Sequence, residues 1–343
     1  MALSEAKDRK RCISLKNPVY IRQAACVTGP KEGRGSYFAD GFDRIWEEDL
    51  GGEKNWEEAE SALQKQAVEL VLAKAGLGAG DIDCVFAGDL LSQSTASSYG
   101  LNGLGVPHYG IFGACSSCGA ALALCSMLID GGYLKRGIAV TSSHFASAER
   151  EFRFPLGYGN QRPLSATWTV TGSGAFLLDQ EEIGTPLAKL TGVVMGEIVD
   201  PGITDAMNMG SCMAPAAALT ITSALKEFPY QPDAYDQIVT GDLGEVGSHA
   251  LVDLMMAQGY DIAERHMDCG LCIYDREKED VHAGGSGCGC SAVMLAAFIL
   301  QKLKSGDWKR VLFVPTGALL SKVRTQEKMT VPSIAHGVVL ERV

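Results

Sequence analysis

The chain has 343 residues, of which 46% are apolar and 21% charged, so it can bury a large core and is too apolar to be disordered. Its formal net charge of −11 argues against nucleic acid or an anionic membrane surface as the main partner, because both require a basic face. A small anion remains compatible with this charge, since a helix N-terminus and a few arginines create a local positive field.

The N-terminal segment MALSEAKDRKRC is charged and lacks the apolar centre of a signal peptide. The longest apolar runs, 120–129 and 292–300, are far shorter than the ~20 residues of a membrane-spanning helix, so we expect them to be core helices. Eleven cysteines in a chain without an export signal argue against a disulfide framework. These features predict a soluble protein made in the cytoplasm.

The first long helix is predicted from a capping box at Asn55-Trp56-Glu57-Glu58. Apolar residues follow at helical spacing, and Gly76 provides a helix end. The predicted apolar face contains Trp56, Ala59, Leu63, Ala67, Leu70 and Val71.

Two stretches of the sequence occur twice in the same order. DIDCVFAGDLL at 81–91 returns as AYDQIVTGDLG at 234–244, so that Asp89 corresponds to Asp242. GACSSCGAALALCSMLIDGGYLKRGIAVTSS at 113–143 resembles GCGCSAVMLAAFILQKLKSGDWKRVLFVPTG at 287–317. Each copy predicts a strand, a glycine-rich turn, a buried helix, a basic turn and a second strand, which is typical of a parallel-rich α/β layer.

We expect an N-terminal tail at 1–16 and two similar halves at 17–180 and 181–343. Segments 169–178 and 334–340 are the expected closing strands of the two halves, and the connection at 179–190 is the expected boundary between them.

Cys115 lies in the turn FGACSSCGA, directly before an apolar helix. The positive end of a helix dipole favours a thiolate at such a place. The hydroxyls of Ser116 and Ser117 and the backbone N–H groups of the turn could hold a carboxylate or an oxyanion. The alternative is that Cys115 is a small buried residue without a role in chemistry.

A cysteine at a strand-to-helix turn in a duplicated α/β chain resembles the thiolase and ketoacyl-synthase superfamily. The segment DAMNMGSCMAPA at 205–216 is similar to the segment that opens the second half of thiolases. Within this superfamily the chain resembles the stage V sporulation protein AD family from about Asn17 onward. The motifs that carry this resemblance are FAGDLL, IFGACS, LIDGG, TSSH, AERxFRxP, TGSGA, ITD, MAPAA, TGDL, DCGLxIY, AGGSGC, TGALLS and IAHGVV. The resemblance implies a thiolase-like fold of two similar α/β halves, stacked in alternating helix and sheet layers.

Cys115 matches the nucleophile of this superfamily, but the partners of that nucleophile do not match. The place of the first catalytic histidine reads Thr240-Gly241-Asp242, and the second base position falls at Gly285-Ser286. The second cysteine of thiolases falls near Thr316-Gly317. Because acyl transfer needs a base and oxyanion donors, the resemblance predicts a binding pocket and no enzyme activity.

The resemblance implies that the chain binds dipicolinic acid (pyridine-2,6-dicarboxylate) or its calcium chelate, for uptake into the developing spore and release in germination. The helix N-terminus at Cys115 would receive one carboxylate, and basic groups after the second strand could serve the other. Each arginine taken alone can equally be a surface charge. The predicted ligand-binding residues are Cys115, Ser116, Ser117, His144, Arg150, Arg162, Ser286 and Thr316, and Arg153 is a further candidate. His266 and His336 line the pocket from the second half or are structural.

The implied partners are integral membrane proteins of the same spore transport assembly, so the chain would be peripheral at the spore inner membrane. A homodimer through a sheet edge is common in this fold, and no nucleic acid is expected. No cofactor or metal is expected either, because the pairs Cys115/Cys118 and Cys269/Cys272 are too far apart for a structural zinc motif.

Two alternatives remain open at this point. One is an active acyltransferase in which Cys115 is the nucleophile and His144 or His336 replaces the missing base. The other is a structural scaffold whose pocket is vestigial.

Overall fold

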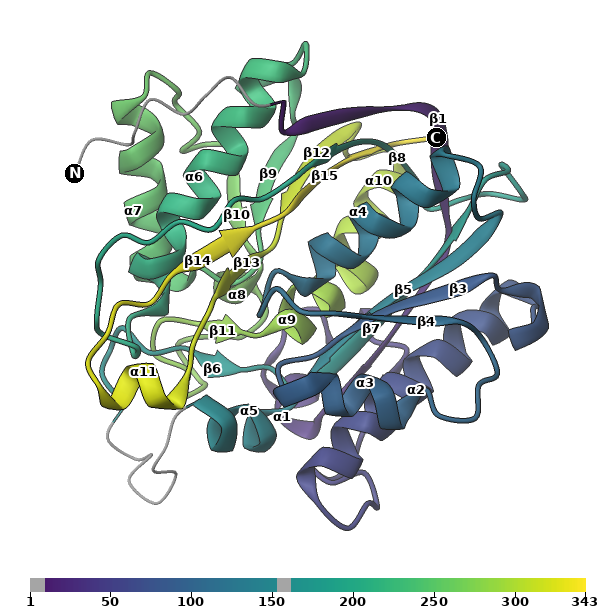
Figure 1. Ribbon diagram of the computed structural model, residues 1–343, viewed down its shortest axis with the longest axis horizontal. Helices are drawn as coiled ribbons and strands as arrows, with labels where there is room; N and C mark the ends of the chain where they lie inside the picture. The colour runs from purple at the N-terminus through teal and green to yellow at the C-terminus, as the bar shows by residue number, and fades with distance from the viewer. Residues whose placement is uncertain (1–9, 153–161) are drawn as a thin grey trace.

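The computed structural model describes residues 10–152 and 162–343 (Figure 1). Its main sheet has the strand order β10-β9-β12-β15-β8-β1-β7-β5-β3-β4. Five strands from the first half of the chain lie in this order, namely β1 (Cys12–Thr28), β3 (Cys84–Gly88), β4 (His108–Ile111), β5 (Arg136–Ser143) and β7 (Gly172–Asp179), and the short strand β2 (Arg44–Ile45) pairs with β1 beside it. The other five are β8 (Ala188–Val194), β9 (Gln237–Thr240), β10 (His266–Asp268), β12 (Arg310–Val314) and β15 (Gly337–Glu341).

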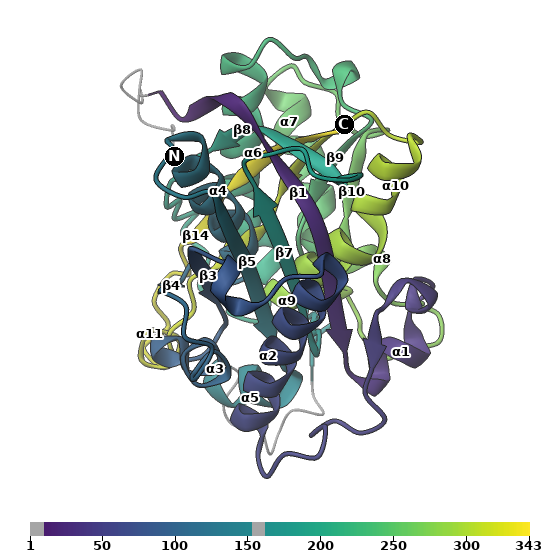
Figure 2. The same cartoon turned by 90° about the vertical axis from the view of Figure 1, so that its right-hand side faces the viewer.

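The two sets of five strands have the same order and the same directions. In the first set β4, β3 and β5 are parallel, while β7 is antiparallel to β5 and to β1. In the second set β10, β9 and β12 are parallel, while β15 is antiparallel to β12 and to β8. The long strand β1 pairs with both β7 and β8 and so joins the sets, as its path in Figure 2 shows. This arrangement agrees with the internal repeat; the division of the chain at 180 stays a prediction.

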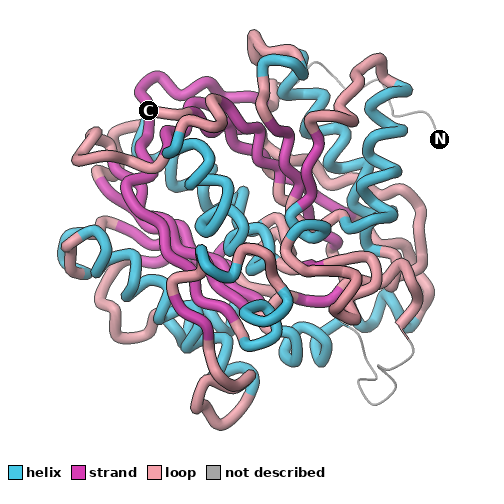
Figure 3. The backbone as a smooth tube through the Cα atoms, turned by 180° about the vertical axis from the view of Figure 1, so that it is seen from behind, coloured by secondary structure: helices cyan, strands magenta, loops and turns pink. Residues whose placement is uncertain are grey.

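Helices cover the outer face of each set of strands, and further helices lie between the two sets (Figures 1 and 3). The outer helices are α2 (Trp56–Ala75) and α3 (Thr95–Gly100) over the first set of strands, and α6 (Met209–Glu227) and α7 (Gly244–Ala257) over the second. Between the two sets of strands lie α4 (Ser117–Asp130), α9 (Cys288–Met294) and α10 (Leu300–Ser305). The shorter elements are α1 (Pro30–Gly35), β2 (Arg44–Ile45), α5 (Phe145–Phe152), β6 (Trp168–Thr169), α8 (Cys269–Cys272), β11 (Gly285–Ser286), β13 (Thr316–Ala318), α11 (Lys322–Gln326) and β14 (Ser333–Ala335).

Helix α2 confirms the expectation from its capping box. The side chain of Asn55 accepts hydrogen bonds from the backbone N–H groups of Glu57 and Glu58, and Gly76 ends the helix in the left-handed conformation. Most of the predicted apolar face is buried, with Trp56 and Leu70 half-buried. The helix packs on β1, β7 and β5.

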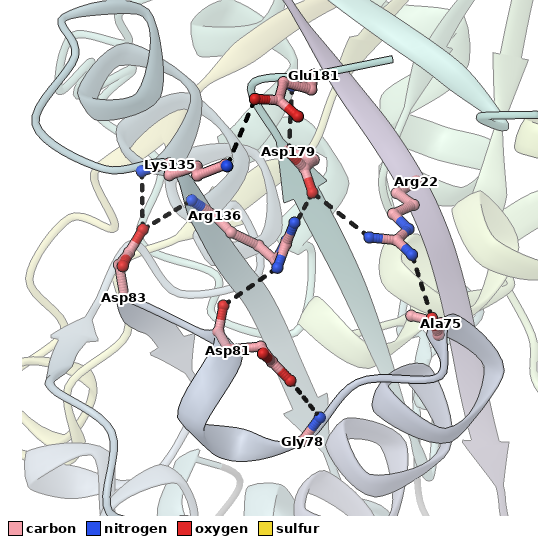
Figure 4. A network of polar contacts seen from close by, with 9 residues as sticks. All are labelled: Arg22, Ala75, Gly78, Asp81, Asp83, Lys135, Arg136, Asp179 and Glu181. Carbon is pink, nitrogen blue, oxygen red and sulfur yellow. Dashed lines mark hydrogen bonds and ion pairs between the residues drawn. The ribbon is translucent and has the colours of Figure 1, made fainter. Parts of the chain in front are cut away.

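An ion-pair arrangement is repeated at equivalent places in the two sets of strands (Figure 4 shows the first copy). In the first copy, Asp83 accepts from the backbone N–H of Arg136, whose Nε donates to Asp179 at 2.6 Å. In the second copy, Asp236 accepts from the N–H of Arg310, whose Nε donates to Glu341 at 2.7 Å. The basic turn that the sequence repeats is therefore used twice for the same purpose, to fix the start of a central strand.

In the part of the chain that the structure describes, one helical segment, Cys288–Ser305, is long and apolar enough to cross a membrane. It comprises α9, a short π-helical turn at Leu295–Ile299 and α10, and 72% of it is buried inside the protein. Its packing against β7 and β5 is that of a core helix, as the sequence predicts for 292–300.

Candidate functional site

Cys115 lies in a tight turn that leads into helix α4. The preceding residue, Ala114, has a positive φ of 48°, a conformation that is strained for a residue with a Cβ. The hydroxyl of Ser116 donates to the carbonyl of Gly113, and that of Ser117 donates to the carbonyl of Ala114, both at 2.7 Å. Both serine side chains are fully buried, and they stabilise the turn from within.

Strand β13 lies directly against this turn. A Cβ placed on Gly317 would be 2.3 Å from the carbonyl oxygen of Gly113 and 3.1 Å from the backbone nitrogen of Cys115. Only glycine allows so close an approach of two backbones. The neighbouring Thr316 is buried, and its hydroxyl donates to Asp242 at 2.9 Å.

The side-chain partner of Cys115 is a carboxylate from the second half of the chain. Burial raises the pKa of Asp242 to about 7, and hydrogen bonds from the Cys115 side chain and the Gly287 N–H act against this rise. The N–H of Gly287 donates to Asp242 at 2.9 Å. Asp242 therefore faces the Cys115 side chain, and a negative charge on its carboxyl would oppose a thiolate at Cys115.

Asp242 belongs to a group of buried carboxyls around this turn. Asp268, 2% exposed, caps the start of α7 and accepts from Thr240, and burial raises its pKa to about 6. In the first half Asp89, the counterpart of Asp242 in the repeat, accepts from the N–H and hydroxyl of Ser97. Burial also raises the pKa of Asp89. The repeat thus places a buried acid after the same strand in each half.

A small cavity lies in front of Cys115, and we call it the inner cavity. Its volume is about 20 Å³, which is room for about one water molecule. Among the described residues that line it there is no histidine. They are Leu90, Ala114, Cys115, Ala148, Thr169, Met209, Ser286, Ala318 and Leu320.

A much larger cavity, the outer cavity, lies on the other side of α5 and β6. Its volume is about 810 Å³, within the range of ~300–1,000 Å³ that is usual for small-molecule sites. Ala146 and Trp168 line the outer cavity, whereas Ala148 and Thr169 line the inner one. Helix α5 and strand β6 therefore form the wall between the two cavities. The charged and aromatic residues that line the outer cavity include Lys31, Arg34, Glu149, Arg162, Trp168 and Asp280.

The structure divides the predicted ligand-binding residues between these places. Cys115 and Ser286 line the inner cavity, while His144 and Arg162 line the outer one. Ser116, Ser117 and Thr316 are buried and hydrogen-bonded within the protein. Arg150 is exposed, and Arg153 lies outside the described residues.

The histidines that the sequence singles out are held by the protein itself. His144 Nε2 contacts the carbonyl of Asp49 at 2.8 Å, and its Nδ1 accepts from the N–H of Ala146, so Nε2 carries the proton. His336 Nδ1 accepts from the N–H of Gly196. Burial lowers the pKa of His144, of His336 and of His266, the last to about 4. All three are therefore neutral near pH 7 and supply no positive charge.

Among the lining residues of the outer cavity that the sequence does not predict are two stacked aromatic rings and a lysine. Phe145 and Trp168 stack with ring centroids 3.8 Å apart, and the Nζ of Lys31 lies 4.6 Å from the centroid of Trp168. The sequence does hold a signal for Phe145 and Lys31, because each follows shortly after the end of a central strand, where pocket residues of α/β proteins gather. No local pattern marks Trp168, whose place depends on the pairing of β6 with β11.

The strand order, the central helices and the cysteine turn define the class of thiolase-like condensing-enzyme folds. Solved structures similar to this chain include a tetronic acid condensing enzyme, AbyA1, with 18% identity, a TM-score of 0.58, and coverage of 94% of this chain and 99% of that one. Another is 3-oxoacyl-[acyl-carrier-protein] synthase III from Aquifex aeolicus, with 14% identity, a TM-score of 0.53, and coverage of 96% and 99%. A third is OleA from Xanthomonas campestris with cerulenin bound, with 16% identity, a TM-score of 0.58, and coverage of 95% and 100%. At these identities the likeness shows the fold alone.

The family follows from the sequence comparisons. Residues 9–341 match the family "Stage V sporulation protein AD". The chain is 45% identical over 328 residues to the stage V sporulation protein AD of Bacillus subtilis, which covers 95% of each chain. The chain therefore belongs to the stage V sporulation protein AD family and has a thiolase-like fold.

Proposed function

We propose that this sporulation protein binds dipicolinic acid, or its calcium chelate, without catalysing a reaction on it. The observation that carries the proposal is the surroundings of Cys115. Its side chain is hydrogen-bonded to the buried carboxyl of Asp242 and faces a cavity of about 20 Å³. An acyl thioester does not fit in a space of about one water molecule. The fold is thus that of an acyl-transfer enzyme, while the turn lacks room for such a substrate.

The identity of the ligand comes from the family resemblance and is supported by the chemistry of the outer cavity. Dipicolinate is a flat ring with two carboxylates, so a receptor needs positive groups and an aromatic or apolar surface. Lys31, Arg34 and Arg162 supply positive groups beside three acids of the same lining, and Phe145 and Trp168 supply the rings. Arginine is suited to carboxylates because its guanidinium can donate two parallel hydrogen bonds.

The cellular role that we propose is transfer of the ligand to and from integral membrane proteins of the same spore transport assembly. The chain would then lie at the inner membrane of the spore as a peripheral component, consistent with the burial of its most apolar helical segment. In this role the protein takes part in dipicolinate uptake during sporulation and in its release during germination.

Titration calorimetry of the full chain with dipicolinate tests binding, and an acyl-coenzyme A turnover assay tests catalysis. We expect a saturable heat of binding and no turnover above the uncatalysed rate. Turnover that disappears in Cys115→Ala would overturn the non-catalytic part of the proposal. The absence of dipicolinate binding, together with retained binding of membrane partners, would favour a scaffold.

One observation favours acyl transfer as a second candidate function. Asp242 is bonded to the Cys115 side chain and has a pKa of about 7, which suits a general base at neutral pH. It would accept the thiol proton as the sulfur attacks a thioester carbonyl, and the coenzyme A thiolate would leave. His144 and His336, the substitute bases expected from the sequence, do not line the inner cavity. Turnover that is lost in both Cys115→Ala and Asp242→Asn would establish this candidate.

A further inference from the structure

Asn102 is the one asparagine in the sequence that precedes a glycine. The pair Asn102-Gly103 lies in the loop between α3 and the edge strand β4, and both residues are exposed. The N–H of Leu104 donates to the carbonyl of Leu101 at 3.1 Å, so the pair occupies the two central places of a tight turn. The turn therefore presents both residues to water.

The groups of this pair that can react with each other are free. In the part of the chain that the structure describes, neither the side-chain amide of Asn102 nor the N–H of Gly103 has a hydrogen-bond partner. Gly103 has a φ of 83°, a left-handed conformation that favours glycine, and a Cβ built on it would meet nothing within 4 Å. The backbone nitrogen of Gly103 is therefore open to approach the side-chain carbonyl of Asn102.

The other asparagines within the described residues are held differently. Asn55 and Asn208 are helix caps, and their side-chain oxygens accept hydrogen bonds from backbone N–H groups. Asn17 precedes Pro18, which has no N–H group. Exposure, a free side-chain amide and a free N–H on the next residue thus come together at Asn102.

From these observations we propose that Asn102 is a site of spontaneous covalent modification, at which the asparagine is converted to a mixture of isoaspartate and aspartate. The backbone nitrogen of Gly103 loses its proton and attacks the side-chain amide carbon of Asn102, which closes a succinimide ring. The proton is returned to the leaving group, which departs as ammonia. Water then opens the ring at one of its two carbonyl carbons. Opening at one carbon gives aspartate, and opening at the other gives isoaspartate, in which the main chain runs through the side-chain carbons.

Isoaspartate changes the loop in charge and in length. It adds a negative charge, and it lengthens the main chain by one carbon between Leu101 and Leu104, whose hydrogen bond closes the turn. Leu101, Leu104 and Val106 are half-buried and pack against the buried cluster that contains Leu63 of α2 and Val85 of β3. A longer main chain shifts these contacts, so we expect the isoaspartate form to be less stable. The proposal does not depend on the proposed function.

Incubation of the full chain at several pH values, followed by peptide mapping with mass spectrometry, tests the site. We expect the peptide that contains Asn102 to give two products with the mass of the acid, one of which an isoaspartyl methyltransferase labels from S-adenosylmethionine. The rate should rise with pH, by up to about 10-fold per pH unit, since the attacking nitrogen must lose its proton. Gly103→Ala should slow the reaction about 10-fold, because a Cβ disfavours the positive φ and hinders the approach of the nitrogen.

Asn102→Gln is the matched control, since it keeps the amide but requires a larger ring, and it should give no product in the same time. The pairs Asp40-Gly41 and Asp130-Gly131 are internal controls, because the N–H groups of both glycines donate to backbone carbonyls at 2.9 Å. These two pairs should form isoaspartate in urea and not in the native chain. A reaction at Asn102 that is slower in the native chain than in urea by roughly 10³-fold or more would overturn the proposal, since it would then require unfolding.

Urea unfolding of the aged chain tests the consequence for stability. The modified chains, separated by ion exchange through their extra charge, should unfold at a lower urea concentration than the fresh wild type. Fresh Asn102→Asp carries the same charge on an ordinary main chain and should keep the wild-type midpoint. An isoaspartate form with an unchanged midpoint, or an equal loss in fresh Asn102→Asp, would show that the longer main chain does not weaken the loop.

Discussion

The buried carboxyl beside Cys115 makes folding stability depend on pH in a way that can be calculated. The pKa of Asp242 is raised by burial from its ordinary value of 3.8 to about 7. Between these values the folded chain keeps a proton that the unfolded chain has released. The contribution of the Asp242 carboxyl to the free energy of unfolding is therefore fully present below pH 3.8 and is lost as the pH rises to about 7.

Asp242→Asn removes this titration and keeps the shape of the side chain. Each pH unit well inside the window corresponds to ~1.4 kcal/mol, and this slope falls as the carboxyl ionises near pH 7. The wild type should therefore lose about 2 kcal/mol more than the variant between pH 5 and pH 7. The amide also has a fixed cost, since it can no longer accept every hydrogen bond from Thr316, Gly287 and Cys115. That cost is the same at each pH and cancels in the comparison.

Urea unfolding at pH 5, 6, 7 and 8 measures the effect. Other buried acids such as Glu32, whose pKa is raised by burial to about 7, contribute equally to both proteins. Ser126→Ala is the control, because the buried hydroxyl of Ser126 donates to a helix carbonyl and contacts no acid among its hydrogen-bond partners. Its stability difference from the wild type should not change with pH. A parallel pH dependence of wild type and Asp242→Asn would refute the reasoning.

Three further predictions concern the packing and assembly of the fold. Gly317→Ala should destabilise the protein by ~1–3 kcal/mol in urea unfolding, because its Cβ would be 2.3 Å from the Gly113 carbonyl, whereas Gly80→Ala, with open space around it, should be near neutral. Arg136→Met should lower the free energy of unfolding by ~3 kcal/mol, and by more than Arg310→Met does, because Asp179, the partner of Arg136, is fully buried. Glu341, the partner of Arg310, is 15% exposed. Equal losses of the two variants in urea unfolding would contradict this. A homodimer should form through the edge strand β4, since Tyr109 in this strand and Phe112 directly after it are 62% and 55% exposed. Light scattering should then give a monomer for the double variant Tyr109→Glu/Phe112→Glu and a dimer for Tyr133→Glu; a wild type that is already monomeric would show the dimer expectation to be wrong.

Several features of the fold could be predicted from the sequence because they depend on local patterns. The capping box at Asn55 and the glycine at Gly76 predict the two ends of α2, since helix ends are decided by hydrogen bonds over a few residues. For the closing segment 334–340 the sequence predicts one strand, whereas the structure has β14 and β15 with His336 between them. The N–H of Gly196 donates to His336 at this break, a contact between residues far apart in the chain.

The candidate site could be predicted only in part, for the same reason. The sequence places Cys115 at the start of a helix, and the structure confirms this position. The sequence does not reveal that the hydroxyls of Ser116 and Ser117 are turned inward to carbonyls of the turn itself. Hydroxyl groups can bond to nearby backbone or to a ligand, and the local pattern is the same in both cases.

Local sequence patterns suffice to predict the repeated strand–turn–helix–strand units, the position of the cysteine turn and the lack of a histidine directly after the strand at 237–240. The tertiary structure decided that Asp242 is the partner of Cys115 and that α5 and β6 separate the inner from the outer cavity. It also decided that Arg162 and Lys31, 131 positions apart in the chain, lie beside the same ring. Periodicity and capping depend on neighbours along the chain, whereas burial, pairing of distant side chains and cavity volume depend on how the layers pack.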